Sequence, residues 1–171
     1  MDAYLIVLRI FHILAGVFWV GASVFFFLFV EPTAKALGPQ AGPFMGHMTQ
    51  KRKLPAVIVS AAGVTVVAGL LLYWQVSGGL DQAWLKSGPG IGFTIGALSA
   101  IGAFVLGLVV IRPNVERMGA LAGEIQASGG PPNPAQAAEL QRLDTRLKSV
   151  GRINIALLTV AVLLMAIARY L

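Results

Sequence analysis

Four long apolar stretches constrain this 171-residue chain more than any other feature of its sequence. They cover residues 4–30, 54–75, 90–111 and 151–169, which is more than half of the chain. A helix needs about 20 mostly apolar residues to cross the hydrocarbon core of a bilayer. We therefore predict an all-α integral membrane four-helix bundle, with residues 1–171 forming a single domain and no separate soluble domain.

Lysine and arginine are distributed unevenly among the segments that connect these stretches. Ten of them lie in the first and third connections or at their edges, and three lie on the opposite side. Because Lys and Arg are enriched in cytoplasmic loops, the count predicts that both termini and the 76–89 loop face away from the cytoplasm. The net charge of +6 could indicate nucleic-acid binding, but these residues flank the spans, so we exclude that class and expect the lipid bilayer as the partner.

The segment 113–150 is predicted to form a cytoplasmic helical-hairpin extension between the third and fourth spans. A short helix should continue from the third span, and the run G-G-P-P-N-P should end it. Asn133 is a predicted N-cap with Pro134 at the first helical position. The amphipathic helix that follows should run unbroken into the last span, with Asp144 on its solvated face.

The first connection is predicted to begin where the first helix ends, at Glu31-Pro32, because the residue before a proline disfavours helix. Its glycines and prolines argue against a continuous helix across residues 33–50.

The first span carries two ionisable residues, Arg9 and His12, in its first half. At 100° per residue they share one helix face with Gly16 and Trp19, and we expect that face to point into the bundle. His12 lies about 12 Å below the outer end of the helix. An ionisable residue at such a depth is a functional-site hypothesis by default, because burying it in lipid is unfavourable.

Two residues near the end of the last span, Met165 and Arg169, should lie at the depth of His12. With Arg9, His12 and Trp19 they form a candidate site for haem b. His12 would be an axial ligand, and the arginines would face the propionates. The alternative is a structural histidine that bonds a carbonyl or hydroxyl group of a neighbouring helix.

Met45, His47 and Met48 form a second candidate set in the first connection. Thioether and imidazole groups favour Cu(I), with another ligand required from elsewhere. The alternative is an interfacial loop whose methionines touch lipid headgroups. His12 is the remaining metal-ligand candidate, but the topology puts it and His47 near opposite sides of the membrane.

Small residues indicate close helix packing in the third span, and one polar residue stands out in the fourth. The small residues recur on one face of the helix and include Gly92, Gly96, Ala103 and Gly107. This pattern fits a crossing within the chain, a homodimer, or space for a flat cofactor. Asn154 is expected to make an interhelical hydrogen bond.

The sequence contains no recognisable catalytic motif and no cysteine, so we expect no enzyme activity from the chain on its own. Three functions stay open: haem binding or membrane redox chemistry through His12, transport of copper or a small solute, and a structural subunit of an oligomer or larger membrane complex.

The first helix, with the run R-I-F-H-I-L-A-G-V-F-W-V-G, resembles the H-x-x-A-x-x-x-W-x-G opening of the copper-resistance D (CopD-like) group and its bacterial four-helix relatives. His12, Trp19 and Gly21 match residue by residue, and the F-V-E-P and M-A-I-A-R-Y segments are similar too. The resemblance implies a multi-pass protein of the bacterial inner membrane, with copper uptake or haem-associated redox chemistry. The chain has about half the helices of the larger members and lacks their further membrane histidines.

Overall fold

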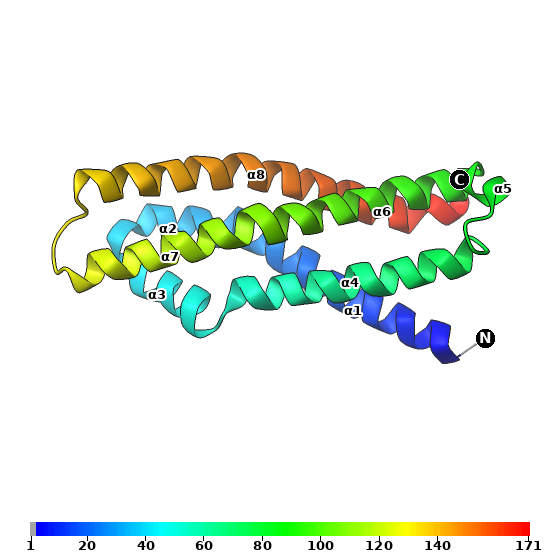
Figure 1. Cartoon of the computed structure of the whole chain (residues 1–171), viewed down its shortest axis with the longest axis horizontal. Helices are drawn as coiled ribbons and strands as arrows, with labels where there is room; N and C mark the ends of the chain where they lie inside the picture. The colour runs from blue at the N-terminus through cyan, green and yellow to red at the C-terminus, as the bar shows by residue number, and fades with distance from the viewer. Residues whose placement is uncertain (1–2) are drawn as a thin grey trace.

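The computed structural model describes residues 3–171, apart from the side chain of Pro39, and four long helices dominate it (Figure 1). α1 (Ala3–Phe25), a π-helical turn (Phe26–Val30) and α2 (Glu31–Leu37) form the first long helix. α4 (Leu54–Val76) is the second. α6 (Gly88–Leu106), a π turn (Gly107–Ile111) and α7 (Arg112–Ala127) form the third. The fourth is α8 (Pro134–Ile167), which ends in a 3-10 turn (Ala168–Tyr170).

Short helical pieces fill the connections. A 3-10 turn (Gly38–Ala41), α3 (Gly42–Gly46) and a π turn (His47–Lys51) link the first two long helices. α5 (Gln82–Leu85) lies between α4 and α6. The described residues contain no β-strand, and all four long helices are long and apolar enough to cross a membrane. The prediction of an all-α, four-helix membrane protein is confirmed at this level.

The first helix does not end at Pro32 as predicted, and it continues to Leu37. A proline inside a helix removes one N–H group, and its ring clashes with the carbonyl four residues back. The π turn relieves this conflict, because the N–H of Glu31 bonds the carbonyl of Phe26 five residues earlier. The helix stops at Gly38, whose φ of 57° is readily adopted only by glycine.

A π turn directly before a proline also occurs in the third long helix. There the N–H of Arg112 bonds the carbonyl of Gly107, and Pro113 follows directly. The predicted continuation of this helix beyond Pro113 is therefore confirmed.

α7 and α8 lie side by side and are joined by residues 128–133 (Figure 1). The N-cap prediction for α8 is confirmed: Asn133 accepts a hydrogen bond from the N–H of Gln136, and the Gln136 side chain accepts one from the N–H of Asn133. The start of α1 and the end of α8 both lie at the other end of the bundle, away from this hairpin.

The helices associate as two tight pairs, α1 with α4 and α6 with α8. The small-residue face of α6 packs against α8 within the chain: a Cβ at Gly92 would stand 2.9 Å from the Ala168 Cβ, and one at Gly96 would stand 3.3 Å from the Leu164 Cβ. Gly107 was predicted on the same packing face, but a Cβ there would meet no atom within 4 Å.

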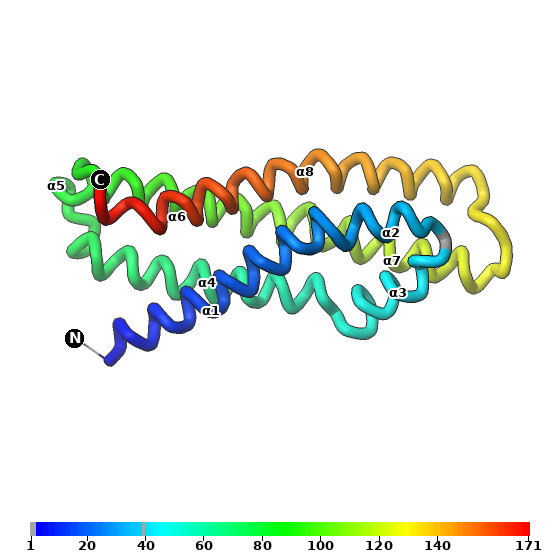
Figure 2. The backbone as a smooth tube through the Cα atoms, turned by 180° about the vertical axis from the view of Figure 1, so that it is seen from behind, coloured from blue at the N-terminus to red at the C-terminus, as the bar shows by residue number. Residues whose placement is uncertain are grey.

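All four helices meet at Trp19. This side chain is 4% exposed and clusters with one residue from each of the other helices, Ala62 of α4, Ala103 of α6 and Leu158 of α8. We call this cluster of four residues the waist of the bundle. Beyond it, the α1–α2 helix leaves α4 and runs toward α8 (Figure 2). A diagonal helix cannot stay in contact with both neighbours, so the bundle is less tightly packed on that side.

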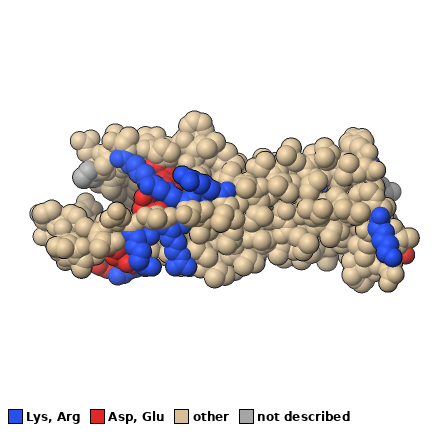
Figure 3. Space-filling model, turned by 90° about the horizontal axis from the view of Figure 1, so that it is seen from above, with Lys and Arg blue, Asp and Glu red and all other residues tan. Residues whose placement is uncertain are grey.

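Charged side chains gather toward the two ends of the molecule on the face shown in Figure 3, and an uncharged band separates them. The side of α1 opposite Trp19 carries large apolar residues that are exposed, among them Leu14 at 66% and Phe11 at 57%. A wide apolar band between charged ends is typical of a helix bundle surrounded by lipid.

Candidate functional site

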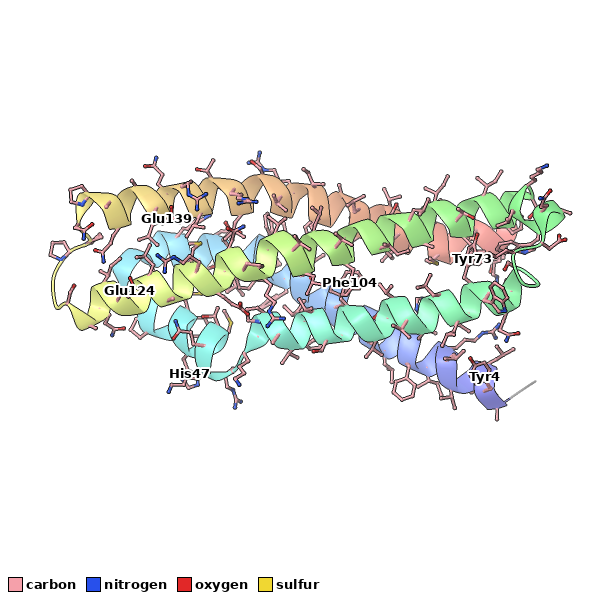
Figure 4. The ribbon with its side chains drawn as sticks, viewed as in Figure 1. Tyr4, His47, Tyr73, Phe104, Glu124 and Glu139 are labelled. Carbon is pink, nitrogen blue, oxygen red and sulfur yellow. The ribbon has the colours of Figure 1, made fainter. Side chains whose placement is uncertain are left out.

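The space beside the diagonal helix is a cavity of about 430 Å³ that reaches from Trp19 toward the α7–α8 hairpin. Side chains from the three longest helices, α4 and the first connection line it. Its walls are almost entirely apolar and include three phenylalanines, Phe26, Phe27 and Phe104. Figure 4 shows Phe104 in the middle of the bundle. Ligand cavities in proteins have volumes of about 300–1,000 Å³ and mainly apolar walls with a few polar groups.

Asn154 is the unusual residue of this cavity. It lines the wall, its side chain is 6% exposed, and its Oδ1 atom has no hydrogen-bond partner among the described residues. Protein atoms cover Oδ1 almost completely without bonding it, so the predicted interhelical hydrogen bond to this atom is wrong. A buried polar atom without a partner typically costs about 1–3 kcal/mol.

Along α8, Asn154 lies one helical turn from Leu158 at the waist, which is about 6 Å, and Asp144 lies about 15 Å away in the opposite direction. Both Asn154 and Asp144 line the cavity. The cavity is thus an elongated apolar space. The amide of Asn154 lies toward its inner end near Trp19, and charged residues lie at its other end, near the hairpin.

At the end of the cavity near the hairpin, which we call its mouth, the lining residues Glu31, Lys35 and Asp144 form an ion-pair cluster with Lys148. Lys35 pairs with Glu31 on its own helix and, at 2.7 Å, with Asp144 of α8. Lys148 approaches the other Asp144 oxygen at 2.8 Å. Asp144 was predicted on a solvated face, but it ties α8 to α2 because the first helix continues past Pro32.

These charged groups lie outside the apolar stretches that we assign to the membrane. Partial burial raises the pKa of Asp144, but hydrogen bonds from Lys148 and Lys35 outweigh it and lower the pKa overall. Partial burial likewise lowers the pKa of Lys35, and its bonds to Asp144 and Glu31 outweigh that effect and raise it. A carboxylate with a lowered pKa adds stability at neutral pH, and this contribution is lost as the pH falls through that pKa.

His12 lies outside this cavity and joins α1 to α4. Its Nδ1 donates a hydrogen bond to the carbonyl of Thr65 over 2.8 Å, and its ring lies against Gly69. The contact is close because Gly69 has no side chain: a Cβ there would stand 2.8 Å from Cε1 of the ring. His12 is thus held at the α1–α4 crossing.

Replacing Gly69 with alanine should push the His12 ring away and break its bond to Thr65. We expect a loss of about 1–3 kcal/mol in the free energy of unfolding, measured by thermal unfolding of the purified protein in detergent. Gly63→Ala on the same helix is the control, since its Cβ would make an ordinary 3.9 Å contact with Phe104. Equal stability of the two variants would show that the His12 contact contributes little.

The other residues predicted around His12 lie elsewhere. Arg9 is exposed, so its predicted place on the bundle-facing side is wrong. The Met165 methyl group packs near Gly96 of α6, and the Arg169 guanidinium lies 4.5 Å from the centroid of the Tyr170 ring. The first turns of α1 are splayed away from the C-terminal end of α8 (Figure 2). The expected pocket between the first and last helices is not formed, and Trp19 instead borders the large cavity.

The second predicted set does not form one cluster either. Met45 lines the cavity and Met48 is half-buried, whereas His47 is exposed at the outer edge of the bundle (Figure 4). Within residues 3–171 no three His, Cys, Asp or Glu side chains gather in a group that could hold a metal ion. Haem and copper binding stay predictions that no contact in this structure tests.

Sequence reasoning missed the cavity, although it had identified Trp19, Met45 and Asn154 individually. The phenylalanines of the wall look like lipid-facing residues in the sequence. One signal was present: Glu31 and Lys35 are four residues apart, as expected for a pair on one helix face, and their charges continue the first span beyond Pro32.

Comparison with known proteins gives no match: no protein-family model, no curated protein and no solved structure is similar to this chain. The resemblance of the first helix to the CopD-like group stays a prediction.

Proposed function

We propose that this chain is a multi-pass membrane protein that binds a small, mainly apolar molecule in the cavity between Trp19 and the α7–α8 hairpin. The observation that carries the proposal is the cavity itself, about 430 Å³ in volume with almost entirely apolar walls. A site that served only to hold the helices together would favour packed side chains, because association of helices in lipid depends on close van der Waals contact.

The orientation belongs to the same proposal. With the basic connections in the cytoplasm, the α7–α8 hairpin and the mouth of the cavity face the cytoplasm, and both chain ends lie on the other side of the bacterial inner membrane. The binding site then lies in the cytoplasmic half of the membrane, and its ligand can come from the cytoplasm or from the inner leaflet.

One probe tests the proposal, namely 1-bromo-3,5-dimethylbenzene added to the purified protein in phosphatidylcholine nanodiscs. Bromine quenches tryptophan fluorescence on contact, and Trp19 borders the cavity. In a Trp74→Phe/Trp84→Phe variant, which retains only Trp19, we expect saturable quenching. The Trp19→Phe variant, which retains Trp74 and Trp84, should show only the linear quenching caused by probe dissolved in lipid. Linear quenching in both variants would reject the cavity as a binding site.

Haem binding at His12 is a second candidate, and one observation favours it. A metal-ligating histidine commonly donates its other ring N–H to a backbone carbonyl, as His12 Nδ1 does to Thr65. This leaves Nε2 as the available ligand atom, although Met165 is not placed to be a second ligand. A Soret band in the purified protein that disappears in His12→Ala would support this candidate, and a colourless protein from haem-sufficient cells would reject it.

A homo-oligomer, a role as a subunit of a larger complex, and copper or small-solute transport are further predictions. The small-residue face of α6 packs against α8, so it no longer favours a homodimer. Stoichiometric Cu(I) binding that is lost when Met45, His47 and Met48 are replaced would support a copper function.

A further inference from the structure

The cavity has a length and a direction as well as a volume. Asp144 and Ile155 of α8 both line it, and they lie about 16 Å apart along the helix. Trp19 and Glu31 line it on the first long helix and lie about 18 Å apart. Dividing the volume of about 430 Å³ by a length of about 17 Å gives a mean cross-section of about 25 Å². The cavity is therefore long and narrow.

We infer that the ligand is one long, unbranched hydrocarbon chain with a polar head, and that its free end lies beside Trp19 while its head lies at the mouth. A long-chain fatty acid and one tail of a membrane lipid share this chemistry. The inference rests on the proposed binding function of the cavity. Two features define the class: the shape of the cavity, and the change from apolar to charged lining along it.

The shape fits a single chain. The hydrocarbon core of a bilayer is about 30 Å thick, so a lipid tail in one leaflet spans about 15 Å, which is close to the length of the cavity. Neighbouring carbon atoms pack about 3.5–4.0 Å apart, so a passage about 5 Å across admits one chain in contact with its walls but not two side by side. A compact ring would contact only one part of the cavity.

The direction follows from the lining. Trp19 lies near the middle of the apolar stretch 4–30, which places it near the centre of the membrane. Glu31, Lys35 and Asp144 lie at the mouth, outside the apolar stretches. A lipid tail in one leaflet has the same direction, with its free end at the centre and its head at the surface. The opposite orientation would bury the polar head among apolar groups, which is unfavourable.

The walls suit a flexible chain. Besides the phenylalanines they include Met45 and Met118, whose unbranched side chains adapt to irregular contacts. Lipid is as apolar as these walls, so a chain gains no hydrophobic stabilisation when it leaves the bilayer. What favours binding is the van der Waals contact that the chain makes with protein along its length.

Two isomers test the orientation in phosphatidylcholine nanodiscs of the Trp74→Phe/Trp84→Phe protein: 16-bromohexadecanoic acid, with bromine at the chain end, and 2-bromohexadecanoic acid, with bromine beside the head. Trp19 is 4% exposed, so bromine in the surrounding lipid reaches it poorly. We expect the end-brominated acid to quench Trp19 with saturation, about fivefold more at its plateau than the other isomer, whose bromine would lie about 15 Å away. The 2-bromo isomer should relieve this quenching, because both chains occupy the same cavity.

A tryptophan at the mouth should show the reverse preference. Met118 lines the cavity and precedes the 128–133 connection by about as many residues as Asp144 follows it, so both lie at the mouth. In a Trp19→Phe/Trp74→Phe/Trp84→Phe/Met118→Trp protein, we expect the 2-bromo isomer to quench more strongly than the end-brominated acid. The same preference at both positions would overturn the inferred orientation.

Brominated bilayer lipid identifies the source of the chain. Nanodiscs are prepared from phosphatidylcholine that carries bromine either near the ends of its tails or near its headgroup, with no acid added. Stronger quenching of Trp19 by the tail-end bromine would support the inference and assign the ligand as a lipid tail. Position-dependent quenching by the free acid alone would support it and assign a fatty acid.

The outcomes separate the inference from the proposed function. Quenching of Trp19 that does not depend on bromine position, in the acids and in the lipids, would overturn the inference. So would saturable quenching by 1-bromo-3,5-dimethylbenzene with no quenching by either kind of chain, and the cavity would then remain a site for compact molecules. Quenching of Trp19 by none of these probes would overturn the proposed function itself.

Discussion

Replacing Trp19 with alanine should lower the free energy of unfolding by about 3–5 kcal/mol, the range expected when a large buried aromatic side chain is removed from a core. Trp19 is 4% exposed and packs in one cluster with a residue from each of the other three long helices. Its removal would join a new void to the existing cavity, and the helices cannot close it without losing their other contacts. Thermal unfolding in detergent, followed by helical circular dichroism, measures the effect.

Trp74→Ala is the matched control for this prediction. Trp74 is 54% exposed near the end of α4, so the same change in residue type removes little buried contact. We expect a change of less than about 1 kcal/mol. If both variants lose the same stability, the helices do not depend on the waist at Trp19 for their association.

Gly90→Ala should have the second large effect, a loss of about 3 kcal/mol or more. A Cβ at Gly90 would overlap the backbone carbonyl of Trp84, at the point where α5 turns into α6. A side chain could rotate away from the new methyl group, but this carbonyl belongs to a turn in which Trp84 also accepts the Ser87 N–H and hydroxyl hydrogen bonds. The methyl group therefore forces the turn and the start of α6 apart.

The control for Gly90 is Gly123→Ala in α7, where a Cβ would meet no atom within 4 Å. Alanine favours the helix over glycine by about 0.5–1 kcal/mol, so this variant should be slightly more stable than the original. Thermal unfolding of the two variants side by side measures the difference. A stable Gly90→Ala protein would mean that the α5–α6 turn can move without disturbing the bundle.

Much of the fold follows from the sequence, because the signals involved are local. Span length and the Asn133-Pro134 cap each depend on a few neighbouring residues, and the long helices and the α8 start were correctly predicted from them. The faces of α1 were also predictable from helical periodicity, with Arg9 as the exception.

The predicted helix end at Pro32 was wrong for a structural reason. Pro32, like Pro113, follows a π turn that lets the helix continue. A π turn shifts the hydrogen-bond register by one residue, and no residue pattern specifies it. One unpredicted turn of this kind carried Glu31 and Lys35 into a helix, which brought Lys35 to Asp144 and formed the mouth of the cavity.

The candidate site was beyond sequence reasoning because it depends on how helices cross. Helix periodicity indicates which face of α1 is buried, but it does not show that α1 packs on α4 near His12 and approaches α8 near Lys35. That diagonal path separates His12, which lies against Gly69, from Met165, which lies near Gly96, and it leaves Asn154 Oδ1 buried without a hydrogen-bond partner among the described residues. The sequence identified these residues individually, and only the three-dimensional structure shows which of them lie close together.

The most direct test of the binding cavity is to fill it and measure probe binding. Gly107 lines the cavity and Gly123 does not, and a Cβ at either position would meet no atom within 4 Å. Phenylalanine is introduced at each position in the Trp74→Phe/Trp84→Phe background, and quenching of Trp19 by 1-bromo-3,5-dimethylbenzene is titrated in nanodiscs. We predict that Gly107→Phe weakens probe binding by about tenfold or more while Gly123→Phe leaves it unchanged. Equal binding to both variants, with both proteins folded, would contradict the assignment of this cavity as the functional site.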